Sequence, residues 1–162
     1  MNYEYSKLEH KILEFTQHEI AEFIKNNDVD FLCQFAFTYD SENFGLYLSF
    51  NNKEQHELNK LNGIDDFDTI NWKYDCFANI YLLDFKQIDI LNERMSYAND
   101  NQWIDFLENQ TINVGKTLQK MIEMPFFKAL QDKAIQIIFK ETEDTITESK
   151  ERWKELNAET KN

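Results

Sequence analysis

Two cysteines and three histidines are the side chains of this 162-residue chain best suited to nucleophilic catalysis or to transition-metal binding. Neither Cys33 nor Cys76 has a histidine or a second cysteine at the spacing of a zinc site. His10 and His18 are eight residues apart, roughly 80° around a helix, so a shared ligand role is weak. Both cysteines lie in apolar runs, where burial raises the pKa of a thiol and makes it inert. We therefore expect no metal site and two buried free thiols.

Motifs that bind nucleotides, phosphates or calcium are also absent from the sequence. There is no G-x-S-x-G, P-loop or G-x-G-x-x-G pattern, and three glycines leave little for a backbone phosphate cradle. Asp65, Asp66 and Asp68 put three carboxylates within four residues, but the twelve-residue calcium loop that closes on glutamate is missing. We interpret this run as an acidic surface loop and predict that the protein has no cofactor.

Two carboxylates fall within the apolar sector of a helix predicted over residues 3–26. At 100° per residue, Glu9 and Glu19 project into that sector. A buried acid with a shifted pKa would indicate a functional site, whereas pairing with a polar group such as Gln34 or Thr38 is the more common arrangement. The apolar face itself is formed by Tyr5, Leu8, Ile12, Phe15, Ile20 and Phe23.

The strongest structural signal is a β-hairpin between Val29 and Asn51. Apolar residues alternate with a period of two on both sides of the polar loop Asp40-Ser41-Glu42-Asn43, which predicts two strands with one aromatic face. Amphipathic helices are expected to cover that face. Its members are Phe31, Cys33, Phe35, Phe37 and Tyr39 before the loop, and Phe44, Leu46, Leu48 and Phe50 after it.

Capping and periodicity patterns divide the rest of the chain into short elements. Together they predict a single α+β domain over residues 1–162, with a small, mainly antiparallel sheet packed against the helices at 3–26 and 101–124. After the hairpin we expect a helix capped by Asn52 that ends near Gly63, and then a strand Cys76–Leu83 that is covered on both sides. A helix capped by Asp84 and a helix 101–124 stopped by Pro125 follow. The chain ends with a strand 134–140, a helix capped by Thr145 and docked by Trp153 and Leu156, and a frayed tail 157–162.

The net charge of −13 is concentrated in the middle of the chain. Residues 28–108 hold 16 acidic and 5 basic residues, a net charge of −11. Such a field repels nucleic acids and anionic membranes and favours a basic protein partner. No apolar stretch is long enough for a transmembrane helix, and the charged N-terminus lacks the apolar core of a signal peptide. We therefore expect a cytoplasmic protein with no membrane contact and no direct nucleic-acid binding, and leave a homo-oligomer open.

The densest part of this acidic region lies next to aromatic residues of the kind that anchor interfaces. We predict that it forms a docking surface whose carboxylates cluster on one face of the fold. The candidate partner-binding residues are Asp65, Asp66, Asp68, Trp72, Tyr74 and Asp75.

Three stretches of the chain carry a family resemblance: FAFTYDSENFGLYLSFNNKEQ, then Trp72-Lys73-Tyr74, and finally SKERWKELN. Together they resemble a family of small bacterial proteins catalogued only as a domain of unknown function. In size and acidity that family is similar to the immunity proteins that neutralise polymorphic toxins. The resemblance implies no catalytic residue.

The favoured interpretation is a non-enzymatic binding module of the immunity type, which neutralises a basic toxin or effector through its acidic surface. One alternative is a small hydrolase or transferase that uses Glu19 or Cys76. Another is a DNA mimic, whose carboxylates would have to stand in two rows like the phosphates of a duplex. A deep pocket with perturbed titratable groups would favour the enzyme.

Overall fold

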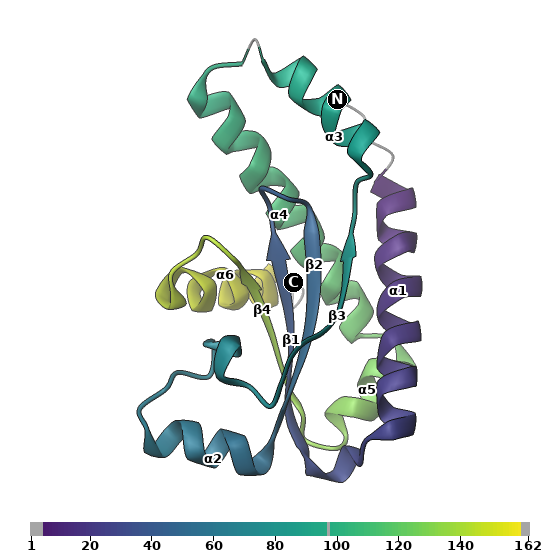
Figure 1. Cartoon of the computed structure of the whole chain (residues 1–162), viewed down its shortest axis with the longest axis vertical. Coiled ribbons are helices and arrows are strands. Elements are labelled where there is room, and N and C mark those ends of the chain that lie inside the picture. Colours follow the sequence, from purple (N-terminus) through teal and green to yellow (C-terminus); the bar gives the residue numbers. More distant parts are fainter. Residues whose placement is uncertain (1–4, 97, 160–162) are drawn as a thin grey trace.

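The computed structural model describes residues 5–96 and 98–159, which form helices on both sides of one small sheet (Figure 1). This arrangement confirms the α+β fold class predicted from the sequence. The elements in chain order are α1 (Tyr5–Asn26), η1 (Val29–Phe31), β1 (Leu32–Asp40), β2 (Gly45–Asn52), α2 (Lys53–Leu61), η2 (Thr69–Asn71), β3 (Tyr74–Tyr81), α3 (Phe85–Met95), α4 (Asp100–Ile122), α5 (Pro125–Gln131), β4 (Gln136–Glu141) and α6 (Ile146–Glu159).

The sheet has the strand order β3-β2-β1-β4 and is mostly antiparallel. β1 and β2 form the predicted hairpin, in which Phe37 is paired with Leu48. β4 lies parallel to β1, with Phe37 opposite Phe139, so the chain must return to the same end of the sheet before β4 begins. Helices α3, α4 and α5 make that return.

The aromatic face of the sheet is the floor of the main core, and α1, α4 and α5 cover it (Figure 1). The predicted floor residues Phe35, Phe37, Leu46 and Leu48 are all fully buried. Rings from the covering helices meet rings from the strands, for example Phe23 with Phe50 at a centroid distance of 4.8 Å and Phe127 with Phe35 at 6.1 Å. Burying each such side chain contributes about 1.5–3 kcal/mol, so this face dominates the stability of the fold.

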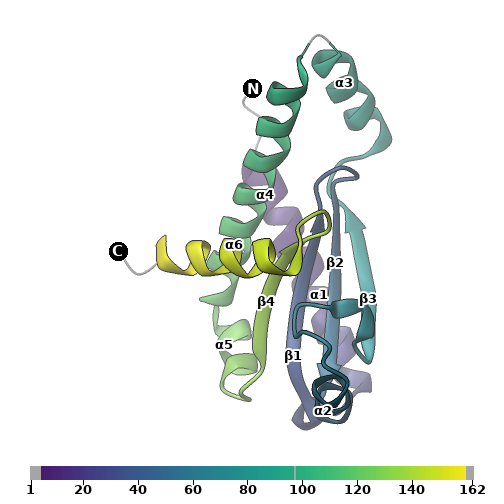
Figure 2. The ribbon, with the colours of Figure 1, turned by 90° about the vertical axis from the view of Figure 1, so that its left-hand side faces the viewer.

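Helix α6 crosses α4 closely because α4 carries a glycine at the contact. A Cβ on Gly115 would lie 2.6 Å from Leu156 Cδ1, closer than Cβ contacts normally come, and 3.1 Å from Phe139 Cε1, so the neighbouring side chains would have to shift. Trp153 donates from Nε1 to the Ile137 carbonyl at 3.1 Å, which fixes α6 across β4 (Figure 2). The prediction that Trp153 and Leu156 dock the last helix is confirmed.

The second face of the sheet carries a polar network and a smaller apolar cluster. Gln34 accepts a hydrogen bond from the Asn51 amide at 3.0 Å and donates to Gln136 at 3.1 Å. The suggestion that Gln34 or Thr38 pairs with a glutamate of α1 is wrong, because α1 packs on the other face. Glu9 instead lies 3.3 Å from Lys120 Nζ, and its side chain is 41% exposed.

The cysteines differ from expectation. Cys76 is exposed, and at φ 47° it lies in the irregularity of the β2–β3 pairing. Cys33 is half-buried, and burial raises the pKa of its thiol to about 11. The expectation of two buried thiols is therefore wrong for Cys76. The prediction that both sides of its strand are covered is wrong as well, because β3 is an edge strand with several exposed side chains.

Two helix boundaries also differ from the sequence prediction. Pro125 does end α4, but it is also the first residue of α5, which the sequence did not predict. Proline suits that first position because its missing N–H would have no partner there. The expected fraying of 157–162 is wrong for 157–159, which belong to α6, while 160–162 lie outside the described residues. No helix within the described residues combines the length and apolar character needed to cross a membrane.

Candidate functional site

The three clustered aspartates of the sequence prediction lie in a loop that we call the acidic segment, residues 64–71. Asp65 accepts the backbone N–H of Phe67 at 3.0 Å and forms an ion pair with Lys150 of α6. Burial raises the pKa of Asp65, but the Lys150 and Phe67 hydrogen bonds outweigh it and hold that pKa below its ordinary value. The carboxylates of the segment are thus largely occupied by neighbouring groups.

The other two aspartates of the segment also have neighbouring partners, a histidine and a side-chain amide. Asp66 lies 3.4 Å from His56 Nδ1, and Asp68 accepts from the Asn71 amide at 3.0 Å. The Asn59 amide donates to the Asn71 carbonyl at 3.0 Å and ties η2 to α2.

Of the two predicted aromatic anchors, Trp72 is buried and Tyr74 is partly buried. Trp72 is 5% exposed and packs in the second apolar cluster with Ala36 and Ile138. Tyr74 meets Phe23 edge to face at 5.0 Å, in the main core. Asp75 is exposed, on the strand that follows the segment, and accepts from Ser49 Oγ at 3.1 Å. The structure therefore brings Asp65, Asp66 and Asp68 together, buries Trp72, and leaves Tyr74 partly buried against the main core.

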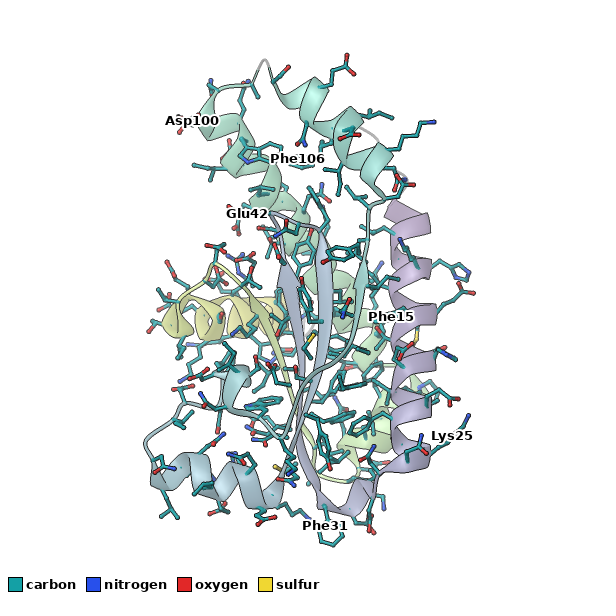
Figure 3. All side chains as sticks on the ribbon, in the orientation of Figure 1. Phe15, Lys25, Phe31, Glu42, Asp100 and Phe106 are labelled. Carbon is teal, nitrogen blue, oxygen red and sulfur yellow. The ribbon has the colours of Figure 1, made fainter. Side chains whose placement is uncertain are left out.

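A second concentration of carboxylates forms a concave site, which the sequence analysis did not predict. This acidic hollow has a volume of about 350 Å³ and lies between the β1–β2 hairpin tip, α4, the β4–α6 loop and α6. Figure 3 labels one of its members, Glu42, at the hairpin tip. Six carboxylates and a single basic residue line it: Glu42, Glu108, Glu141, Glu143, Asp144, Glu148 and Arg152.

Glu141, the last residue of β4, holds the walls of the acidic hollow together. It is 4% exposed, and its carboxylate accepts backbone N–H groups from Ser41 at 3.0 Å, Glu143 at 2.6 Å and Asp144 at 3.2 Å. One buried carboxylate thus fixes both the hairpin tip and the loop that leads into α6. Charge-assisted hydrogen bonds of this kind are stronger than neutral ones, so the loop geometry is well defined.

Arg152 is fully occupied by two of the carboxylates. Its Nε donates to Asp144 at 2.7 Å and its Nη2 donates to the same carboxylate at 2.8 Å, while Nη1 pairs with Glu108. The hydrogen bond to Asp144 in particular raises the pKa of Arg152 above its already high value, so the guanidinium stays charged. Its positive charge is therefore already matched by two acids within the hollow.

The three remaining acids at the mouth of the acidic hollow have no cation. Glu42, Glu143 and Glu148 are exposed, and none of the ion pairs between described residues includes them. The Glu148 carboxylate does accept the Thr145 N–H at 2.8 Å, as the cap of α6. Beside them, Ile104 of α4 is 61% exposed and lines the same hollow. The arrangement can accept a guanidinium or ammonium group, with Ile104 against the aliphatic stem of that side chain.

The structure offers little to a metal or to a nucleophilic mechanism. Within the described residues, no three His, Cys, Asp or Glu side chains are grouped so that they could hold a metal ion. Burial, followed by the charge of Asp75, raises the pKa of the Cys76 thiol, whereas a reactive cysteine has a lowered pKa.

The residues of the acidic hollow escaped the sequence analysis because they are far apart in the chain. They come from residues 41–42, 104–111 and 141–152. Two features of the hollow are visible in the local sequence. The first is the capping box, in which Glu148 N donates to Thr145 Oγ1 at 3.3 Å and Thr145 N donates to Glu148 at 2.8 Å. The second is the position of Ile104 at the edge of the α4 apolar stripe. Neither signal showed that the parallel pairing of β4 would bring these segments together.

Comparison with known proteins gives a family and nothing further. No curated protein and no solved structure matches the chain. The family described as "Domain of unknown function (DUF4303)" matches residues 12–158. Because this match covers most of the sequence, the chain belongs to the DUF4303 family.

Proposed function

We propose that this protein is a non-enzymatic binding module of the immunity type, whose acidic hollow receives a basic side chain of a partner toxin or effector. The observation that carries the proposal is the mouth of the hollow, where Glu42, Glu143 and Glu148 are exposed, lack a cation and stand beside exposed Ile104. An arginine or lysine of a partner would find charge at its tip and apolar surface along its stem.

The charge of the whole molecule supports the same partner. A net charge of −13 speeds encounter with a basic protein and repels acidic ones. Charges at the rim of an interface act mainly on the association rate, while a side chain enclosed in a hollow acts on the dissociation rate. The acidic hollow should affect both rates. Its exposed acids face solvent and would act on association, whereas its inner wall, formed by the Arg152–Asp144 pair, would enclose the partner's side chain and slow dissociation.

The alternatives have less support. The Cys76 environment raises its thiol pKa, which is unfavourable for a nucleophile. A DNA mimic needs two rows of carboxylates on a convex surface, whereas the acids of the hollow surround a concavity.

The test is affinity capture from the cells that make the protein, with two matched baits beside the native chain. The hollow variant carries Glu42→Gln, Glu143→Gln and Glu148→Gln, and glutamine retains the capping position of Glu148. The control variant removes three exposed acids elsewhere, by Glu54→Gln, Glu57→Gln and Asp89→Asn. Captured proteins are identified by mass spectrometry, produced separately, and measured for binding to all three chains.

We expect a basic protein that binds the native chain and the control variant, and binds the hollow variant at least tenfold more weakly. Equal binding to the native chain and the hollow variant would place the contact elsewhere and overturn the proposal. A captured small substrate that the native chain converts into product would favour the enzymatic alternative instead.

A further inference from the structure

A second hollow lies on the other side of the hairpin tip and has a different character. We call it the apolar pocket. It has a volume of about 450 Å³ and is lined by Lys11, Asn43, Tyr81, Leu83, Asp84 and Ile88. This volume falls in the usual range for small-molecule sites, about 300–1,000 Å³, and its mixture of apolar walls and a few polar groups is typical of them.

Lys11 of α1 gives the apolar pocket an ammonium group that is held only by neutral partners. Its Nζ donates to the Tyr81 carbonyl at 2.8 Å and to the Leu82 carbonyl at 3.0 Å. No ion pair of Lys11 occurs among the described residues. Because an ammonium has three N–H donors, one remains for a ligand. Lys11 thus supplies a positive charge with an unused donor in a molecule of net charge −13.

The acidic residue in the same lining does not supply that counter-charge. The Asp84 carboxylate accepts the Gln87 N–H at 2.7 Å, and the Gln87 side chain accepts the Asp84 N–H at 2.9 Å, so both groups cap α3. Asp84 therefore remains a negative charge at the edge of the pocket, where it disfavours a second negative charge on any ligand.

The other walls of the apolar pocket are suited to a hydrocarbon group. Leu83 and Ile88 supply aliphatic surface. Tyr81 is 54% exposed and also lines the pocket. Asn43 is held at the hairpin tip, since its backbone N–H and its amide both donate to Asp40 at 2.9 Å. The pocket is thus bounded by groups that are already fixed.

We infer that the apolar pocket binds a small organic monocarboxylate, whose carboxylate accepts from Lys11 Nζ and whose hydrocarbon part lies against Leu83, Ile88 and the Tyr81 ring. A carboxylate matches the one remaining donor of Lys11, while a phosphate would bring further charge and more acceptors than the pocket can satisfy. This binding is separate from the acidic hollow and does not depend on the function proposed for it.

The test uses 4-phenylbutyrate as the probe and its neutral amide, 4-phenylbutyramide, as the matched ligand. Binding to the full chain is measured by calorimetry and by chemical-shift changes at Lys11, Tyr81 and Ile88. We expect the acid to bind about tenfold more tightly than the amide, because only the acid forms a charge-assisted hydrogen bond. Lys11→Met should abolish this preference and weaken binding of the acid by about tenfold.

Two further variants keep the inference falsifiable if Lys11→Met perturbs the fold. Ile88→Trp should fill the pocket and remove binding of both ligands. Lys86→Met removes an exposed lysine of α3 outside the lining and should leave the affinity unchanged. The inference is overturned if the acid and the amide bind the native chain equally, if neither binds at millimolar concentration, or if Ile88→Trp binds the acid as the native chain does.

Discussion

Helix α6 supplies one cation to each of two acidic regions, and the two regions use it differently. Lys150 pairs with Asp65 of the acidic segment, while Arg152, two residues later, pairs with Glu108 and Asp144 in the acidic hollow. In the segment, each aspartate has a partner of its own, and of the neighbouring aromatic residues Trp72 is buried and Tyr74 is partly buried. In the hollow, three glutamates remain exposed without a cation beside an exposed isoleucine.

The difference follows from how each region is assembled. Aspartates that are adjacent in sequence serve their own loop: Asp65 accepts an N–H two residues later and Asp68 accepts an amide three residues later. Such local hydrogen bonds are the usual role of aspartate in turns. The acids of the hollow come from three distant segments. Glu141 holds the loops, and Arg152 pairs with Glu108 and Asp144. The remaining glutamates of the hollow have no ion pair among the described residues.

The largest expected effect separates the two regions by stability. Glu141→Ala leaves the N–H groups of Ser41, Glu143 and Asp144 without their acceptor, so we expect a loss of about 3 kcal/mol in the free energy of unfolding. Asp66→Ala, in the acidic segment, should change it by less than about 0.5 kcal/mol. Denaturant melts of both variants measure the difference. Similar losses in the two variants would show that the hollow is no more organised than the segment.

The next effect compares the two cations of α6. Arg152→Leu leaves Asp144, whose side chain is only 10% exposed, without its partner, and should cost about 2 kcal/mol. Lys150→Leu breaks a more exposed pair and the contact of Lys150 with the Phe67 ring at 5.7 Å, and should cost less than about 1 kcal/mol. Thermal or denaturant melts of the two variants show which substitution lowers the free energy of unfolding more. The reverse order would mean that the acidic segment is the better-defined region.

Much of the fold followed from local patterns in the sequence. The alternation around Asp40-Ser41-Glu42-Asn43 predicted the hairpin, and the caps at Asn52, Asp84 and Thr145 are present in the structure. Each of these signals concerns residues that are close in the chain. The sequence does not predict the short helix α5, because a proline such as Pro125 indicates the end of one helix as readily as the start of another.

The candidate site could not be predicted in the same way. The sequence makes Trp72 a candidate partner-binding residue because it is an aromatic residue next to acids, but Trp72 packs on the second face of the sheet with Ala36 and Ile138. The acidic hollow depends on β4 pairing parallel to β1, which puts the β4–α6 loop beside the hairpin tip. Strand order is a long-range property that periodicity does not encode.

A smaller effect concerns the rate at which a basic partner binds. Removing three charges in the acidic hollow, by Glu42→Gln, Glu143→Gln and Glu148→Gln, should lower the association rate severalfold at low salt. Removing three charges in the acidic segment, by Asp65→Asn, Asp66→Asn and Asp68→Asn, should lower it less, because those carboxylates already have neighbouring partners. Stopped-flow measurements over a range of salt concentrations compare the two. A larger decrease in association rate for the segment variant would indicate that the partner docks on Asp65, Asp66 and Asp68, as the sequence predicts.

The smallest expected effect is the pH dependence of the acidic segment. The pKa of Asp65 lies below its ordinary value because the hydrogen bonds from Lys150 and Phe67 outweigh the opposing effect of burial. A carboxylate with a lowered folded-state pKa stabilises the fold above its unfolded pKa, and this contribution is lost as the pH falls through the folded pKa. In Lys150→Met, burial is opposed mainly by the Phe67 N–H, so the pKa of Asp65 should rise.

The corresponding loss of stability at neutral pH should be below about 0.5 kcal/mol, since solvent screens this partly exposed pair. The native chain and Lys150→Met should therefore converge in stability as the pH is lowered, once Asp65 is protonated in both. Arg152→Leu provides the contrast, because its larger cost also includes lost packing and unpaired hydrogen-bonding groups and should persist over more of the pH range. Titration of the Asp65 carboxyl carbon by NMR, with melts from neutral to acid pH, measures both quantities. If the pKa of Asp65 is the same with and without Lys150, then the pair does not neutralise the segment, and its aspartates are as available to a partner as the glutamates of the hollow.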